Sequence, residues 1–263
     1  MKYSVFTKPW KNITVEELCK KVSGWGFDGI EFPLRDGYQV EPANAEKGLP
    51  ALAKTMADHG LSIMSVASST EESVFAACQA AGVPLIRIMG SGLDKGYSEC
   101  AKEFKSYLET LLPLCKKYGV QVGIQNHNNN MVSSTMELRV LLEDYDPMYI
   151  GAVWDAAHSG LCMESANKAL DIIWDKLILV NLKNAYWKQK NGPEASQATF
   201  DPYFTSGRHG MASYPDIIKY LKDHGYSGDI CLPAEFTDEA LVDDLTPPEL
   251  QYVKGLFRDS ATR

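Results

Sequence analysis

Eight apolar segments of strand length alternate with eight segments of helix length along this sequence, and that alternation limits the fold more than any other feature. Strict alternation of this kind is typical of a parallel sheet wrapped by helices. The strands are expected at residues 3–7, 27–32, 61–66, 83–89, 120–126, 149–155, 177–183 and 229–235. The helices are expected at residues 14–24, 49–59, 68–81, 98–118, 134–143, 164–174, 214–224 and 247–257.

Eight units over 263 residues favour a closed (β/α)8 TIM barrel over an open doubly wound sheet. Thr14 and Glu17 form the pattern of a capping box at one helix start, and Gly119 follows a helix end. The sequence contains no linker or low-complexity tract, so a single domain is expected over residues 1–263. No G-x-G-x-x-G motif follows the first strand, so no nucleotide cofactor is expected.

Composition excludes several classes of protein. A net charge of −8 argues against a nucleic-acid partner, which would need a basic surface. No apolar run reaches about 18 residues, so no membrane span is expected. The six cysteines are scattered without paired spacing, which indicates free thiols and a cytoplasmic location.

The sixth strand ends in Asp155, and His158 follows three residues later. A carboxylate and an imidazole at the carboxyl end of a strand suit metal binding or proton transfer. A structural alternative is equally compatible with this segment alone. In that alternative Asp155 caps the next helix and His158 is a surface loop residue.

Other polar residues stand at the ends of the expected strands, where a (β/α)8 barrel places its chemistry. Because buried polar groups need partners, such a concentration at one rim predicts an active site or the remnant of one. Within this set Glu31 is expected to orient a neighbour and Arg87 to be structural. The set comprises Glu31, Arg87, Gln125, Asn126, His127, Asp155, His158, Asn181, Lys183 and Glu235.

A series of short motifs occurs along the chain in this order: Gly26–Glu31, Gln125-Asn126-His127, Asp155-x-x-His158, Asn181-Leu182-Lys183-Asn184, Gly225–Gly228 and Glu235. With this series nearly the whole chain resembles the xylose isomerase-like TIM barrels, which include sugar-phosphate isomerases, ketose 3-epimerases and, more distantly, endonuclease IV. The resemblance implies a small carbohydrate substrate and a divalent Mn or Mg ion.

In the epimerases of this family a Glu, an Asp, a His and a Glu hold the metal, and the matching positions here are Gln125, Asp155, Asn181 and Glu235. Two of the four depart from the pattern. The amide carbonyls of Gln125 and Asn181 can still ligate a hard cation, so a metal remains possible. Without a metal, these two amides would bind sugar hydroxyls directly.

The substitution at Gln125 removes one of the family's two bases, because an amide accepts no proton. Two-base epimerisation at C3 is therefore disfavoured. A one-base isomerisation or β-elimination remains, with Glu235 as base, His158 or His127 as acid, and Lys183 stabilising the oxyanion. Asn126 and His127 are expected to bind substrate, although His127 also suits a loop residue paired with a carboxylate.

Residues 184–211 are expected to form a long loop. A loop of this length is usually a lid or a contact surface. Trp187, with Trp10 and Tyr38 from other loops, suits stacking on a sugar, and Arg208 or His209 suits binding of an anionic group. The aromatic residues equally suit the interface of a homo-oligomer.

Three functions are compatible with these observations to different degrees. The first is a sugar or keto-sugar isomerase or epimerase-like enzyme, or a related lyase or dehydratase. The second is a carbohydrate-binding or regulatory barrel without turnover. The third, a phosphodiesterase, is disfavoured because only five histidines are present and a three-metal cluster needs several.

Overall fold

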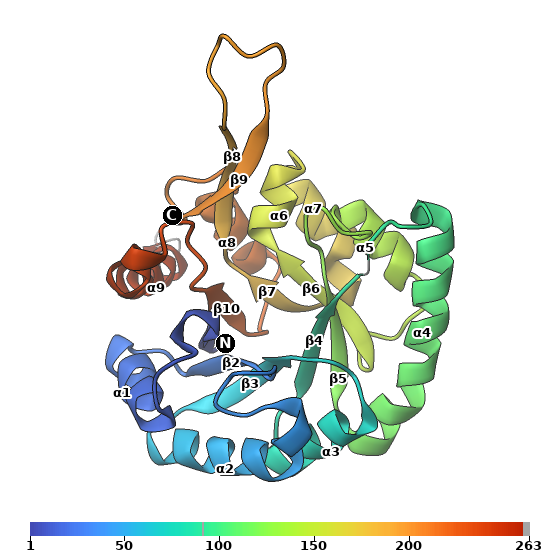
Figure 1. The fold of residues 1–263 in the computed structure, drawn as a ribbon, viewed down its shortest axis with the longest axis vertical. Coiled ribbons are helices and arrows are strands. Elements are labelled where there is room, and N and C mark those ends of the chain that lie inside the picture. Colours follow the sequence, from blue (N-terminus) through green and yellow to red (C-terminus); the bar gives the residue numbers. More distant parts are fainter. Residues whose placement is uncertain (91, 260–263) are drawn as a thin grey trace.

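The computed structural model describes residues 1–90 and 92–259, and a closed barrel of eight parallel strands forms its centre (Figure 1). The strand order follows the chain, and the last strand pairs with the first. The predicted TIM barrel is thus confirmed. Its strands are β1 (Tyr3–Phe6), β2 (Gly29–Pro33), β3 (Ser62–Ala67), β4 (Leu85–Met89), β5 (Gln121–Gln125), β6 (Ile150–Asp155), β7 (Leu177–Asn181) and β10 (Ile230–Pro233).

Helices between the strands form the outer layer of the barrel (Figure 1). The capping box before α1 is present, with the Glu17 amide donating to the Thr14 hydroxyl at 3.2 Å. The short helix α6 follows β6 directly and precedes the helix expected at residues 164–174. The helices are α1 (Val15–Trp25), α2 (Ala45–Asp58), α3 (Glu72–Ala81), α4 (Tyr97–Tyr118), α5 (Thr135–Leu142), α6 (Ala156–Leu161), α7 (Ala166–Ile173), α8 (Tyr214–Asp223) and α9 (Val242–Asp259), with 3-10 turns η1 (Lys8–Trp10), η2 (Pro42–Asn44), η3 (Trp174–Lys176) and η4 (Glu239–Leu241).

The inside of the barrel has an apolar layer below a polar one. Because side chains alternate along a strand, residues two apart face the same side. Val153 of β6 belongs to a small apolar cluster, and Asp155 follows two residues later at the rim. Leu85 and Arg87 of β4 repeat the pattern. The strand period therefore brings buried polar groups together at the carboxyl end of the barrel.

The segment expected to be a long loop contains a β-hairpin, so that prediction was wrong. Strands β8 (Asn184–Gln189) and β9 (Phe200–Thr205) pair in antiparallel register, and the hairpin projects away from the barrel (Figure 1). Aromatic side chains meet across the two strands, with the rings of Tyr186 and Tyr203 5.2 Å apart. Such cross-strand pairs stabilise a sheet only after the strands have met, so the sequence pattern of either strand alone is weak.

All six cysteines are free thiols. None of the helices within residues 1–90 and 92–259 has both the length and the apolar character that crossing a membrane requires.

Candidate active site

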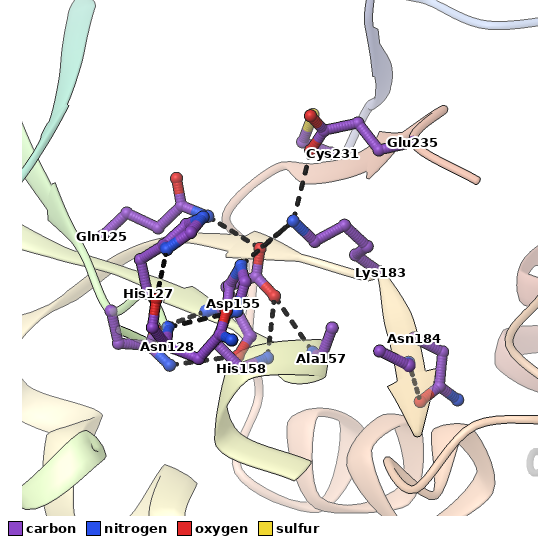
Figure 2. Close-up of polar contacts among 12 residues, drawn as sticks. Gln125, His127, Asn128, Asp155, Ala157, His158, Lys183, Asn184, Cys231 and Glu235 are labelled. Atoms are coloured by element: carbon purple, nitrogen blue, oxygen red, sulfur yellow. Dashed lines mark hydrogen bonds and ion pairs between the residues drawn. The ribbon is translucent and has the colours of Figure 1, made fainter. Parts of the chain in front are cut away.

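Asp155 ends β6 and is fully buried. One carboxylate oxygen accepts hydrogen bonds from the backbone amides of Ala157, at 3.0 Å, and His158, at 3.3 Å, so Asp155 does cap α6. The other oxygen accepts a hydrogen bond from Gln125 Nε2 at 2.7 Å and faces the rim (Figure 2). Burial raises the pKa of Asp155, and the nearby ammonium of Lys183 opposes that rise. Capping the helix and contributing to the site are therefore compatible roles.

The Lys183 ammonium lies between two carboxylates (Figure 2). Its Nζ is 3.2 Å from Glu235 Oε2 and 3.7 Å from Asp155 Oδ2. Burial alone would lower the pKa of this amine, but Asp155 and Glu235 together raise it. The ring of Phe204, from β9, lies 4.7 Å from the same nitrogen. Lys183 is thus a fixed, charged donor at the rim.

Glu235 lies two residues beyond β10 and is held by two lysines. Its Oε1 is 2.6 Å from Lys8 Nζ, and its Oε2 contacts Lys183. Burial would raise the pKa of this carboxyl, but the two ammonium groups lower it well below its usual range. A carboxylate with so low a pKa is a weak base at neutral pH.

His158 is fully buried in α6, so the alternative of a surface loop residue was wrong. Its Nε2 is 3.0 Å from Lys183 Nζ, and its Nδ1 faces the Asn128 amide at 3.3 Å. Both neighbours are donors, so the neutral ring can accept a hydrogen bond from only one of them, and protonation would place an N–H against a donor on both sides. Burial first, and then the charge of Lys183, lower the pKa of His158 well below its ordinary value. His158 is therefore a neutral side chain that contacts Lys183 and holds its ammonium in position.

His127 follows β5 and lies against His158, with ring centroids 4.0 Å apart and ring planes tilted by 37°. Its Nδ1 lies 2.8 Å from the carbonyl oxygen of Asn128. A carbonyl only accepts hydrogen bonds, so this contact assigns the ring proton to Nδ1 and leaves a lone pair on Nε2. Burial also lowers the pKa of His127. At pH 7 the side chain is therefore a neutral imidazole. Its acceptor nitrogen, Nε2, is not the nitrogen that contacts Asn128.

The remaining polar residues at the rim form hydrogen bonds and an ion pair with their neighbours. Arg87 Nε is 2.6 Å from Glu31 Oε1, and a second nitrogen of the same guanidinium is 3.0 Å from Oε2. Arg87 also donates to the carbonyl oxygen of Gln125. Asn126 is fully buried and bonds both the amide and the carbonyl of Asp155, at 2.7 and 3.2 Å. Asn126 therefore fixes the end of β6.

Asn181, which ends β7, differs from these residues in its hydrogen bonding. Its side-chain oxygen is buried and has no hydrogen-bond partner among the residues that the structure describes. An unsatisfied buried acceptor is costly, and it indicates a missing donor. Because Asn181 lines the cavity described next, a substrate hydroxyl is a suitable donor.

Two adjoining cavities open at this rim. The inner one, of about 70 Å³, is polar, and the outer one, of about 660 Å³, widens toward solvent. Four side chains line both cavities, namely Lys8, His127, Lys183 and Glu235. The outer cavity is also lined by Tyr38 and by Phe204 of the hairpin. The shared residues place a neutral imidazole, two lysines and a carboxylate around one space.

Three side chains expected at the site lie elsewhere. Trp187 donates from its ring nitrogen to the Leu161 carbonyl at 2.9 Å, which docks β8 on α6. The Arg208 guanidinium stacks on Tyr252 of α9, 3.7 Å from the ring centre, and His209 contacts Ser206 at 3.1 Å. None of the three lines the inner or the outer cavity.

Trp10 is likewise buried, against Trp25, and does not line the cavities. Conversely, Lys8 and Arg35 line the inner cavity, although sequence analysis did not single them out. Each lies two residues beyond the end of a barrel strand, β1 or β2, which is the signal that would have found them.

Residues 19–256 match the family model of the xylose isomerase-like TIM barrel. The chain belongs to this family. Among its relatives is an inosose dehydratase of Bacillus licheniformis, which is 25% identical over 84% of this chain and 81% of the relative. An inosose dehydratase of Salmonella typhimurium is 23% identical over 49% of this chain, but this match spans only 44% of that relative.

Solved structures with this fold cover almost the whole chain at low identity. A xylose isomerase domain protein from Planctomyces limnophilus superposes with a TM-score of 0.78, at 13% identity, and covers 100% of this chain and 99% of that one. A 3-keto-D-glucoside 4-epimerase from E. coli gives 0.75, at 13% identity, over 97% and 99%. A xylose isomerase-like protein from Mycobacterium smegmatis, in complex with magnesium, gives 0.68, at 13% identity, over 97% of each chain.

The donor set of this family member does not suit a resident divalent cation. Asp155 and Glu235 are the two carboxylates at the positions where the family's epimerases bind their metal. Lys183 Nζ lies 3.7 Å from Asp155 Oδ2 and 3.2 Å from Glu235 Oε2. A divalent cation between them would face this positive charge. The carbonyl of Gln125 is directed at Arg87, which leaves Asn181 as the unengaged oxygen. The ammonium of Lys183 therefore supplies the positive charge at this position.

Proposed function

We propose that this chain is an enzyme acting on a polyhydroxylated ketone, from which it removes the proton next to the carbonyl and eliminates the β-hydroxyl as water. Its relatives include inosose dehydratases, which supports a dehydratase. The observation that carries the proposal is the pairing of a neutral imidazole, His127, with a charged amine, Lys183, around the same cavities. The single base-and-acid pair favours elimination or isomerisation over two-base epimerisation.

His127 is a better candidate for the base than Glu235. A general base works best when its pKa lies near the working pH, and the two lysines lower the pKa of Glu235 far below that range. The pKa of His127 is lowered from 6.5 by burial, so its Nε2 carries a lone pair at neutral pH. Glu235 then has the role of holding Lys8 and Lys183 in place.

The reaction then needs few groups. His127 Nε2 takes the proton from the carbon next to the ketone, and the electron pair moves to the carbonyl oxygen. Lys183 donates a hydrogen bond to the developing enolate, and His158 positions Lys183 from below. When the enolate collapses, the C–O bond at the β-carbon breaks, and the His127 imidazolium returns its proton to the leaving hydroxide. The products are water and an unsaturated ketone.

We propose in addition that the catalysis is metal-independent and that the enzyme acts in the cytoplasm. The position of Lys183 between the two carboxylates supports the first point, and six free cysteines support the second. Binding of Gln125 and Asn181 to substrate hydroxyls stays a prediction, and so does assembly into a homo-oligomer.

Proton abstraction is testable by NMR in D₂O with a panel of inososes and keto-sugars. We expect exchange of the proton next to the ketone and formation of an unsaturated ketone, both unaffected by dialysis against EDTA. His127→Asn should lower the rate by about 10²- to 10⁴-fold. It should also remove the fall in rate that we expect for the wild type below pH 6.5, where His127 becomes protonated.

His209→Asn is the matched control, because His209 lies outside the cavities. Its rate should equal that of the wild type. Binding of the panel without any exchange would instead indicate a carbohydrate-binding barrel. An unchanged rate in His127→Asn, with a loss in Glu235→Gln, would make Glu235 the base. A rate that EDTA abolishes would disprove metal independence.

A further inference from the structure

Arg35 is a half-buried guanidinium without an anionic partner. Its side chain lies over the ring of Phe6, at 6.0 Å, and no hydrogen bond or ion pair to it occurs within residues 1–90 and 92–259. Burial lowers the pKa of Arg35 and the charge of Arg87 lowers it further, while Tyr38 and the more distant carboxylates Glu31 and Glu235 oppose that shift without contacting Arg35. A desolvated cation next to a second cation is unfavourable unless an anion completes the site.

A charge count around the inner cavity supports the same conclusion. Four cationic side chains line this cavity: Lys8, Arg35, Arg87 and Lys183. Three carboxylates pair with them, since Glu31 holds Arg87, Glu235 holds Lys8, and Glu235 and Asp155 hold Lys183. Both histidines at the site are neutral at pH 7, because their pKa values are lowered. The charge that has no partner is that of Arg35.

Space for an anionic group exists beside Arg35. A separate cavity of about 300 Å³ is lined by Arg35 and Arg87, together with Ser68, Ser69 and Tyr107. The three hydroxyl groups are already engaged, with the Leu34 carbonyl, the Glu71 carboxylate and the Thr70 hydroxyl. Arg35 lines this cavity and the inner cavity alike, so it lies at the boundary of the two. A guanidinium is a usual partner of carboxylates and phosphates, and Arg35 is the group lining this cavity that remains to bind one.

We propose that the substrate carries a single anionic group, a carboxylate or a phosphate ester, and that Arg35 binds this group while the ketone end faces Lys183 and His127. The inference rests on the proposed function for the ketone end alone. It places the anion subsite at the ends of β2 and β4, and not in the segment of Arg208 and His209, where the sequence suggested it.

Binding of three related probes tests the subsite. D-fructose is neutral, D-fructose 6-phosphate carries a phosphate, and 5-keto-D-gluconate carries a carboxylate; calorimetry and thermal shifts measure their affinities. We expect one anionic probe to bind about 10- to 100-fold more tightly than D-fructose, as a charged hydrogen-bonded pair provides. The anionic probe that binds more tightly than D-fructose identifies the anion as a phosphate or a carboxylate.

Arg35→Gln should abolish this preference, while Arg35→Lys should keep part of it. Arg208→Gln, which removes a guanidinium outside the cavities, should behave like the wild type. Equal affinity for all three probes, or a preference that survives Arg35→Gln, would overturn the proposal. An Arg35-dependent preference without proton exchange on any ketone would instead refute the proposed function and leave the subsite standing.

Discussion

The pair of Glu31 and Arg87 illustrates at the scale of single residues how charge is tolerated inside this barrel. Glu31 is fully buried, and both of its oxygens contact Arg87. Arg87 in turn covers the ring of Phe6, 4.9 Å away, and binds Gln125. A buried ion pair is tolerated only when both charges are satisfied. Loss of one partner is therefore more damaging than the pair is stabilising.

Glu31→Gln should lower the free energy of unfolding by about 3–5 kcal/mol, because it leaves the Arg87 cation buried without a counter-charge. Asp144→Asn is the control. Asp144 also pairs with a cation, Lys105, at 3.4 Å, but its side chain is 77% exposed. Its loss should cost less than about 1 kcal/mol. Urea unfolding measures the free energy of unfolding of both variants. Equally small losses in the two would show that the buried pair contributes little to stability.

At the scale of elements, the β8–β9 hairpin is attached to the barrel by buried polar side chains from two sides. Asn184, at the start of β8, bonds the carbonyls of Gly207 and Ala212, at 3.0 and 2.8 Å. Glu249 of α9 accepts a hydrogen bond from the Gly207 amide at 2.6 Å. These contacts hold the segment after β9, so the hairpin can present Phe204 to the cavity and to Lys183.

The Glu249 contact should make this attachment pH-dependent. Burial raises the pKa of Glu249 to about 7, from an ordinary value of 4.5. The folded state thus keeps a proton that the unfolded state has lost, and stability falls as the pH rises from 4.5 through 7. The total loss should be roughly 3 kcal/mol, since the pKa rises by about 2.5 and each pKa unit corresponds to about 1.4 kcal/mol.

Glu249→Gln replaces the protonated acid by a neutral acceptor, so this part of the pH dependence should disappear. Urea unfolding at pH 5 and pH 8 should therefore show a larger advantage of the variant at pH 8. The exposed Glu46→Gln serves as the control and should change stability equally at both pH values. A constant difference between Glu249→Gln and the wild type at the two pH values would contradict the raised pKa.

At the scale of the whole molecule, closure of the barrel brings strands together at positions where side chains do not fit. A Cβ atom on Gly123 of β5 would lie 2.5 Å from a methyl group of Val153 and 3.1 Å from Leu85. Both neighbours belong to the apolar cluster inside the barrel. Glycine at this position therefore makes room for the packing of the neighbouring strands.

Gly123→Ala should lower the free energy of unfolding by about 1–3 kcal/mol through overpacking of the barrel interior. Gly24→Ala is the matched control, because it places the same methyl group in helix α1 with no atom within 4 Å. It should raise stability by about 0.5–1 kcal/mol, as alanine favours a helix. Denaturation of the two variants side by side measures the effect. If both shift stability in the same direction, the interior is less tightly packed than the structure indicates.

The sequence by itself determined the barrel and the rim. Apolar runs and helix caps are local signals, and a period of two along each strand assigns residues such as Asp155 to the carboxyl end. The positions of His127, Lys183 and Glu235 around one space followed from the same reasoning, because parallel strands end at one edge.

Only the tertiary structure decided which of these groups are charged, and which are satisfied. The low pKa of Glu235 depends on Lys183 and on Lys8, and Lys8 is 227 residues away along the chain. The hairpin depends on cross-strand pairs and on Glu249, and Arg35 stands out only because its neighbours are already paired. Partner choice, desolvation and cavity shape arise from contacts distant in sequence, so no local pattern contains them.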